Sequence, residues 1–229
     1  MFPFPKPYWD GWTRSKGFKP ELVASRRRLF EAAERGHWPV VFELLSEDAG
    51  AELVNATRLD ESSGYTLLHL AVTAESGFEV VERLLAAGSF RAARCSMGER
   101  PYDIAQRQGQ SVLLPLLLPE KKHPVPDQTL SSIQVLFREL ILEDGLSPVR
   151  EMRLPSLEVL LEQEEPTMTF QIPFGVFVYR LQILSFPIAI EFEQKEWVLL
   201  VRSYQRMGDG IERHYVVSEH GRLLVSIRG

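Results

Sequence analysis

The sequence predicts a short stack of α-helical hairpins, a small solenoid, followed by a small α+β domain with an antiparallel sheet. Residues 64–71, with the sequence GYTLLHLA, recur as residues 98–105, GERPYDIA, at an offset of 34 residues. A period of this size is typical of proteins built from stacked repeats. From Thr167 onward, apolar residues alternate with polar ones, which is typical of strands. A Pro-containing linker at residues 121–128 separates the two patterns.

Each copy of the repeat predicts two paired helices. In the middle copy, residues 64–71 begin an inner helix, and residues 78–88 form an outer helix with one apolar stripe. Residues 29–37 and 38–45 form a corresponding pair upstream. The repeats are expected at about residues 26–57, 60–91 and 94–120, so the stack occupies residues 26–120.

This pattern resembles the ankyrin repeat, whose signature is a turn, a Thr-Pro-Leu-His-x-Ala helix start and a second helix. The resemblance implies about three repeats and a binding surface. Thr66 is expected to cap the inner helix, and His69 to tie its turn to the neighbouring turn. Asp103 takes the position of this histidine in the last copy. Pro115 is expected to kink or shorten the last outer helix.

The N-terminal segment, residues 1–25, is rich in proline and aromatic residues. Prolines at alternate positions favour an extended chain, which cannot bury its own aromatic side chains. This segment either packs on its own protein or binds another one, and we favour packing within the chain because exposed aromatic clusters lower solubility. The aromatic residues are Phe2, Phe4, Tyr8, Trp9 and Trp12.

Residues 129–229 predict the α+β domain. Residues 130–141 have the spacing of an amphipathic helix, and residues 156–163 predict a second, short helix. Turn signals at residues 208–210 and 219–221 separate the last strands of an antiparallel meander with five or six strands. The strand candidates are 167–172, 176–184, 188–192, 197–204, 214–217 and 223–227.

The whole chain resembles a group of bacterial proteins with a few ankyrin repeats, a Pro-rich joint and a C-terminal domain containing Arg-Leu-Pro-x-Leu-Glu. Residues 153–158, RLPSLE, match that stretch, and residues 170–173, FQIP, follow it in an aromatic strand. This resemblance implies an architecture and no particular chemistry.

Composition and charge exclude several classes of function. The 229 residues are 45% hydrophobic and 25% charged, as in ordinary globular proteins, and the net charge of −5 gives no reason to expect nucleic acid binding. The single cysteine, Cys95, cannot form an internal disulfide. No apolar run is long enough for a membrane span or a signal peptide, so we expect a cytoplasmic protein.

Residue patterns for catalysis or metal binding are also absent from the sequence. The five histidines have no helical metal-binding spacing, and no nucleophile motif or phosphate-binding glycine loop occurs. Glu212 and His214 share one face of a strand, where a solvated pair is the simpler interpretation than a metal site. We therefore expect no cofactor, no metal and no enzymatic activity.

In the ankyrin family, partners usually bind the concave face, formed by turn tips and inner-helix positions. By motif position these residues are Glu34, Arg35, Ser62, Ser63, Tyr65, Thr73, Ala74, Met97, Glu99, Arg107 and Gln108. Tyr65, Arg35 and Arg107 are the expected anchors, because Tyr and Arg are enriched at binding hot spots. The first hypothesis is therefore a monomeric adaptor that binds a protein partner.

A second hypothesis is that the C-terminal sheet encloses a site for a small molecule or an unrecognised enzymatic activity, with the repeats as a targeting module. The aromatic residues available to line such a pocket are Phe170, Phe174, Phe177, Tyr179, Phe186, Phe192 and Trp197. The same residues would serve equally well in an ordinary hydrophobic core.

Overall fold

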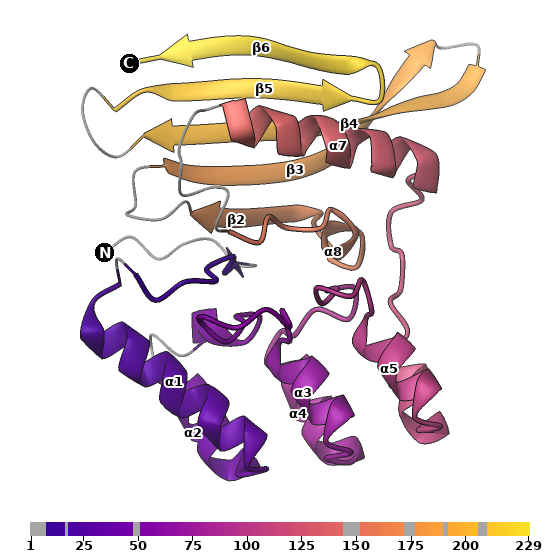
Figure 1. The fold of residues 1–229 in the computed structure, drawn as a ribbon. Coiled ribbons are helices and arrows are strands. Elements are labelled where there is room, and N and C mark those ends of the chain that lie inside the picture. Colours follow the sequence, from indigo (N-terminus) through magenta and orange to yellow (C-terminus); the bar gives the residue numbers. More distant parts are fainter. Residues whose placement is uncertain are drawn as a thin grey trace. The chain divides into compact units, whose positions relative to one another are not determined.

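The computed structural model describes residues 8–16, 18–47, 51–143, 152–171, 177–189, 192–205 and 210–229. Two compact units divide the chain (Figure 1). The helical unit contains Trp9–Glu120, and the sheet unit contains Lys121–Gly229 together with Tyr8. Phe2, Phe4, Phe174 and the predicted turn at 208–209 lie outside the described residues.

The helical unit is built from three helix pairs. Within each pair the two helices pack together, and the first helix of the middle pair, α3, also contacts the first helices of both neighbouring pairs (Figure 1). The helices are α1 (Pro20–Glu34), α2 (Trp38–Ser46), α3 (Leu67–Thr73), α4 (Phe78–Ala86), α5 (Pro101–Arg107) and α6 (Leu114–Leu117). Short 3-10 helices lie at Ala51–Leu53 and Ser111–Leu113.

Small side chains allow the inner helices α1, α3 and α5 to approach closely. Ala33, Ala71 and Ala105 are almost fully buried. The largest side chains of the same core are Leu29, Phe30, Leu67, Leu68, Leu84, Ile104 and Leu117. As predicted, Pro115 accompanies a short last outer helix: α6 has only four residues and follows a 3-10 turn. Helix α1 begins at Pro20, ahead of the predicted repeat boundary at residue 26.

The three inner helices end with the same pattern of hydrogen bonds. Two consecutive backbone N–H groups return to the last turn, as in a Schellman motif. The residue that turns the chain has a positive φ in each case: 71° at Gly36, 51° at Glu75 and 73° at Gly109. The backbone N–H of the following residue closes each turn. His37 donates to Ala32 O (2.8 Å), Ser76 to Ala71 O (3.0 Å) and Gln110 to Ala105 O (2.9 Å).

Glu75 is the strained member of this set, because an L-residue in the left-handed region costs about 1–2 kcal/mol. Glu75→Gly is expected to raise the free energy of unfolding by about 1 kcal/mol, after the larger entropy of an unfolded glycine is subtracted. Urea denaturation measures this change. The reverse substitution, Gly36→Glu, is the matched control and should be destabilising, although no atom lies within 4 Å of the position of its Cβ. A less stable Glu75→Gly variant would contradict the explanation.

The sheet unit contains an antiparallel meander. Strands β2 to β6 pair consecutively, in the order β2-β3-β4-β5-β6. The strands are β1 (Tyr8–Trp9), β2 (Thr167–Gln171), β3 (Phe177–Ala189), β4 (Phe192–Gln205), β5 (Glu212–Ser218) and β6 (Gly221–Arg228). Helix α7 (Asp127–Glu143) lies across β4, β5 and β6, and the short helix α8 is Glu158–Leu161 (Figure 1).

Two details of the predicted sheet unit were wrong. Residues 188–192 do not form a separate strand, since β3 runs to Ala189 and β4 begins at Phe192. Pro187 is still directly opposite Lys195, and the register shifts between Pro187 and Ala189, so an irregularity follows the proline without ending the strand. The predicted helix at 156–163 is shorter, because only Glu158–Leu161 is helical.

The face of the sheet under α7 is filled by aromatic and aliphatic side chains. Phe170 lies edge-on to Phe137 of α7 at 6.0 Å between ring centroids, and it stacks on Tyr179 of β3 at 4.9 Å. Leu181 and Val201, on the same face, are fully buried. The aromatic residues Phe170 and Tyr179 therefore belong to the core, whereas Phe186 is exposed.

Candidate functional site

The turn before α3 is held by His69, which is completely buried. Its Nδ1 atom accepts a hydrogen bond from the Thr66 backbone N–H at 3.3 Å and lies 2.8 Å from the Thr66 hydroxyl. Its Nε2 atom lies 3.2 Å from the backbone oxygen of Glu99, in the turn before α5. Because Nδ1 accepts, Nε2 carries the hydrogen that is donated to Glu99. His69 thus links neighbouring turns as the sequence predicted, and Thr66 forms a capping box with His69 at the start of α3.

Further hydrogen bonds join the middle helix pair to the last one. The backbone N–H and the hydroxyl of Ser96 donate to Ser63 O at 2.9 and 2.8 Å. Gln108 Nε2 donates to Thr73 O at 3.2 Å, and Gln110 Nε2 donates to Val72 O at 2.8 Å. Neighbouring turn tips and helix ends are therefore fixed relative to each other, which gives a surface with a defined shape.

The eleven residues predicted to bind a partner differ in exposure. Tyr65 is half-buried because its ring stacks on that of His69, with 5.4 Å between centroids. Met97, at the tip of the turn before α5, is the most accessible apolar side chain, with 81% of its surface exposed. The exposed members of the set are Glu34, Arg35, Ser62, Thr73, Ala74, Met97 and Arg107, and the half-buried ones are Ser63, Tyr65, Glu99 and Gln108.

Three of the predicted binding residues, Glu34, Glu99 and Arg107, are already in ion pairs within the chain. Arg107 donates to both carboxylate oxygens of Glu99, at 3.1 and 3.2 Å, and this hydrogen bonding raises the pKa of Arg107. Glu34 accepts from the guanidinium of Arg58. These three charged side chains are therefore held by ion pairs rather than moving freely.

From Trp9 onward, the described residues of the N-terminal segment pack on the helices of their unit. Trp9 is buried and stacks on Phe90 at 6.1 Å. Asp10 accepts two hydrogen bonds from Arg26 Nη1 of α1, at 3.0 and 2.9 Å, and both side chains are more than nine-tenths buried. The backbone oxygen of Trp12 also accepts a hydrogen bond from Arg26. Trp9, Asp10 and Trp12 therefore pack within the chain.

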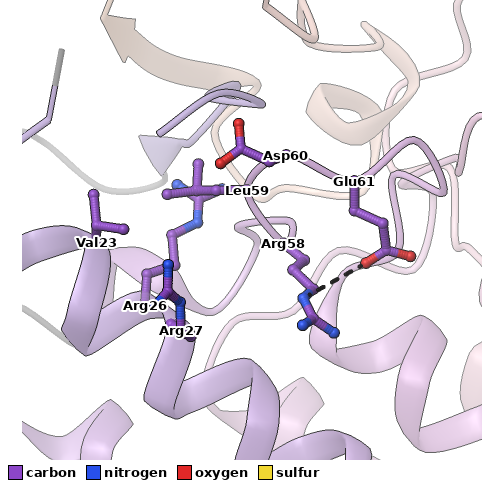
Figure 2. Close-up of a pocket in the computed structure, with 7 residues that line it drawn as sticks. All are labelled: Val23, Arg26, Arg27, Arg58, Leu59, Asp60 and Glu61. Atoms are coloured by element: carbon purple, nitrogen blue, oxygen red, sulfur yellow. Dashed lines mark ion pairs between the residues drawn. The ribbon is translucent and has the colours of Figure 1, made fainter. Parts of the chain in front are cut away.

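A surface pocket of about 370 Å³ lies beside this ion pair, and Figure 2 shows the side chains around it. Arg58 lies 4.0 Å from Glu61 across one side of the pocket. Hydrogen bonds from Ser15 lower the pKa of Asp60, so this carboxylate is ionised at neutral pH. The lining residues are Val23, Arg26, Arg27, Arg58, Leu59, Asp60 and Glu61.

Other candidates for chemistry have ordinary environments. Cys95 is buried and does not form a disulfide. His214 hydrogen-bonds Glu212 at 2.8 Å, which lowers the pKa of that glutamate. In the part of the chain that the structure describes, no cluster of three metal-binding side chains occurs. No described helix has the length and apolar character needed to cross a bilayer.

Sequence reasoning did not anticipate the buried Arg26–Asp10 pair or the Arg58–Glu34 pair. The sequence does contain a signal for the Arg26–Asp10 pair. Asp10 lies between two tryptophans, and if the tryptophans are buried, the carboxylate between them needs a buried cation as its partner. The second pair has no sequence signal, because it depends on how the loop after the first helix pair returns to α1.

Comparison with known families identifies a repeat in the middle of the helical unit. The family model of the ankyrin repeat matches residues 63–94, which contain α3, α4 and the turns around them. No curated protein matches the chain. The chain therefore contains a recognisable ankyrin repeat, a unit that generally supports protein–protein interaction.

Proposed function

We propose that this protein is a non-catalytic interaction module that binds a protein partner through the turn tips and inner-helix positions of its helical unit. The observation that carries the proposal is the recognisable repeat itself, with Ser62, Thr73, Ala74 and Met97 exposed around it. The cross-turn hydrogen bond from His69 to Glu99 O restrains this surface, and such restraint lowers the entropy cost of binding.

The proposal includes two further ankyrin repeats, formed by α1 with α2 and by α5 with α6. Support comes from the matching helix ends at Gly36, Glu75 and Gly109 and from the contacts of α3 with α1 and α5. A partner surface would then extend from Arg35 to Gln108, and the pocket beside Arg58 adjoins it through the Arg58–Glu34 pair. In this proposal the protein is an adaptor in the cytoplasm, where Cys95 stays reduced.

The chemistry of the proposed surface defines the kind of partner. Met97 offers an apolar contact, and Tyr65 offers the edge of a ring whose face rests on His69. Around them, Arg107 is held by Glu99, and Arg35 remains exposed. Such a surface suits a partner with a small apolar protrusion surrounded by polar groups, in the manner of a hot spot with a polar rim.

Met97→Glu is the sharpest test of this surface, since it places a charge where an apolar contact is proposed without disturbing the buried core. We expect capture of a protein partner from lysate by the full chain to fall at least about tenfold, because burying an unpaired charge is costly. Tyr65→Ala combined with Arg107→Glu should also abolish capture.

Val112→Glu is the matched control, because Val112 is 71% exposed but lies on the 3-10 helix before α6, away from the turn tips. Quantitative mass spectrometry should detect the same partner with the wild type and with Val112→Glu. Undiminished capture by Met97→Glu, with an unchanged melting temperature, would remove this surface from the proposal.

A further inference from the structure

The register of the sheet brings three basic residues into one row. Arg180 of β3 is directly opposite Arg202 of β4, and Arg202 is directly opposite His214 of β5. Directly opposite residues in antiparallel strands have Cα atoms only about 4.5–5.5 Å apart. Two arginines at such positions are unfavourable neighbours, because like charges facing each other across a strand pair repel.

This row lies on the face of the sheet that α7 does not cover. Tyr179 and Ser203, the neighbours of Arg180 and Arg202 in their strands, are buried together with Phe170 under α7. Because side chains alternate along a strand, Arg180 and Arg202 point away from that helix. Both are exposed, and within the described part of the chain neither arginine makes a hydrogen bond or an ion pair.

The other charged groups near the row are already paired with one another. Glu212 accepts from His214 at 2.8 Å, and it is directly opposite Arg228 of β6. Hydrogen bonding from His214 lowers the pKa of Glu212, and the charges of Arg228 and Arg202 contribute in the same direction. On the opposite face, Arg222 is neutralised by Glu143 of α7. Among the described residues, Arg180 and Arg202 are thus two adjacent positive charges without an ion pair, and only Arg202 has a carboxylate, that of Glu212, near it on this face.

We propose that Arg180 and Arg202 form a binding site for the phosphate group of a phosphate monoester. A dianionic phosphate between the two guanidinium groups would replace their repulsion with two sets of charge-assisted hydrogen bonds, for which the planar guanidinium is well suited. A carboxylate carries only one charge and would leave the pair partly uncompensated.

Tyr204 extends this site along β4. It is two residues beyond Arg202 and therefore on the same face, and about half of its surface is exposed. Its ring can pack against an aromatic group attached to the phosphate. An aryl phosphate is accordingly expected to bind more tightly than inorganic phosphate.

The test is a titration of the full-length protein with phenyl phosphate, inorganic phosphate and benzoate at constant ionic strength, followed by backbone amide NMR signals. We expect saturable shifts at Arg180, Arg202 and neighbouring positions, with phenyl phosphate binding best and benzoate worst. Arg202→Gln should weaken phosphate binding at least about tenfold, since a charge-assisted pair is lost.

Arg138→Gln is the control, because it removes one exposed positive charge from α7 and leaves the row intact. Phosphate should also raise the melting temperature of the wild type and of Arg138→Gln, but not that of Arg202→Gln. Shifts that do not saturate, an equal response to benzoate, or an equal loss in Arg138→Gln would each overturn the assignment. These outcomes concern the sheet unit and do not depend on the proposed partner surface of the helical unit.

Discussion

Asp10→Asn is expected to lower the free energy of unfolding of the helical unit by about 3 kcal/mol, because it leaves the charge of Arg26 buried without its carboxylate. Arg26 also donates to the backbone oxygens of Thr57 and Trp12, so it cannot turn toward water without breaking those bonds as well. Denaturation followed by tryptophan fluorescence measures the loss.

Asp60→Asn is the matched control for this prediction. It makes the same chemical change at an exposed carboxylate of the same unit, which accepts a hydrogen bond from the Ser15 backbone N–H at 3.1 Å. Exposed charges contribute little to stability, so a cost below about 1 kcal/mol is expected. If the two substitutions lower the free energy of unfolding equally, the stability that the Arg26–Asp10 pair contributes does not come from its burial.

Phe137→Ala is expected to destabilise the sheet unit by about 3–5 kcal/mol, the usual cost of removing a large buried aromatic side chain. Phe137 is fully buried on α7, and its ring contacts Phe170, which in turn stacks on Tyr179. The cavity would therefore open in the middle of the helix–sheet interface, where rigid strands restrict collapse around it. Calorimetry of the full chain is the direct measurement.

Val135→Ala, two residues earlier on α7, serves as the control. Its side chain is 54% exposed, so its loss should cost well under about 1 kcal/mol while leaving the helix intact. An effect of Phe137→Ala no larger than that of Val135→Ala would mean that α7 does not carry the core of this unit.

The features that the sequence predicted correctly are governed by local residues. Thr66 and His69 act within one turn of helix and the next turn tip, and Pro115 acts on its own helix, so their effects follow from spacing alone. The amphipathic pattern of residues 130–141 likewise predicted α7. The strand candidates 176–184 and 188–192 proved to belong to longer strands, because an irregularity in the pairing near Pro187 does not end β3, and the sequence does not show whether a strand continues past such a point.

The candidate site was less predictable, for a physical reason. Motif position anticipated which residues surround the turns, but their role in binding stays a prediction. Whether Arg107 is free or held by Glu99 depends on how side chains from two turns of the chain meet, and the pairing of Arg180 with Arg202 depends on strand register. A one-residue change of register would reverse the faces of an entire strand.

The contact between Trp9 and Phe90 also has a consequence for the order of folding. Helix pairs close short loops and form early, whereas a contact between residues this far apart must await a long loop closure. During synthesis the N-terminal segment leaves the ribosome long before Phe90 does, and domains fold as their sequences emerge. Trp9 therefore stays in water until most of the helical unit has been translated, and its docking is among the last steps that complete the unit.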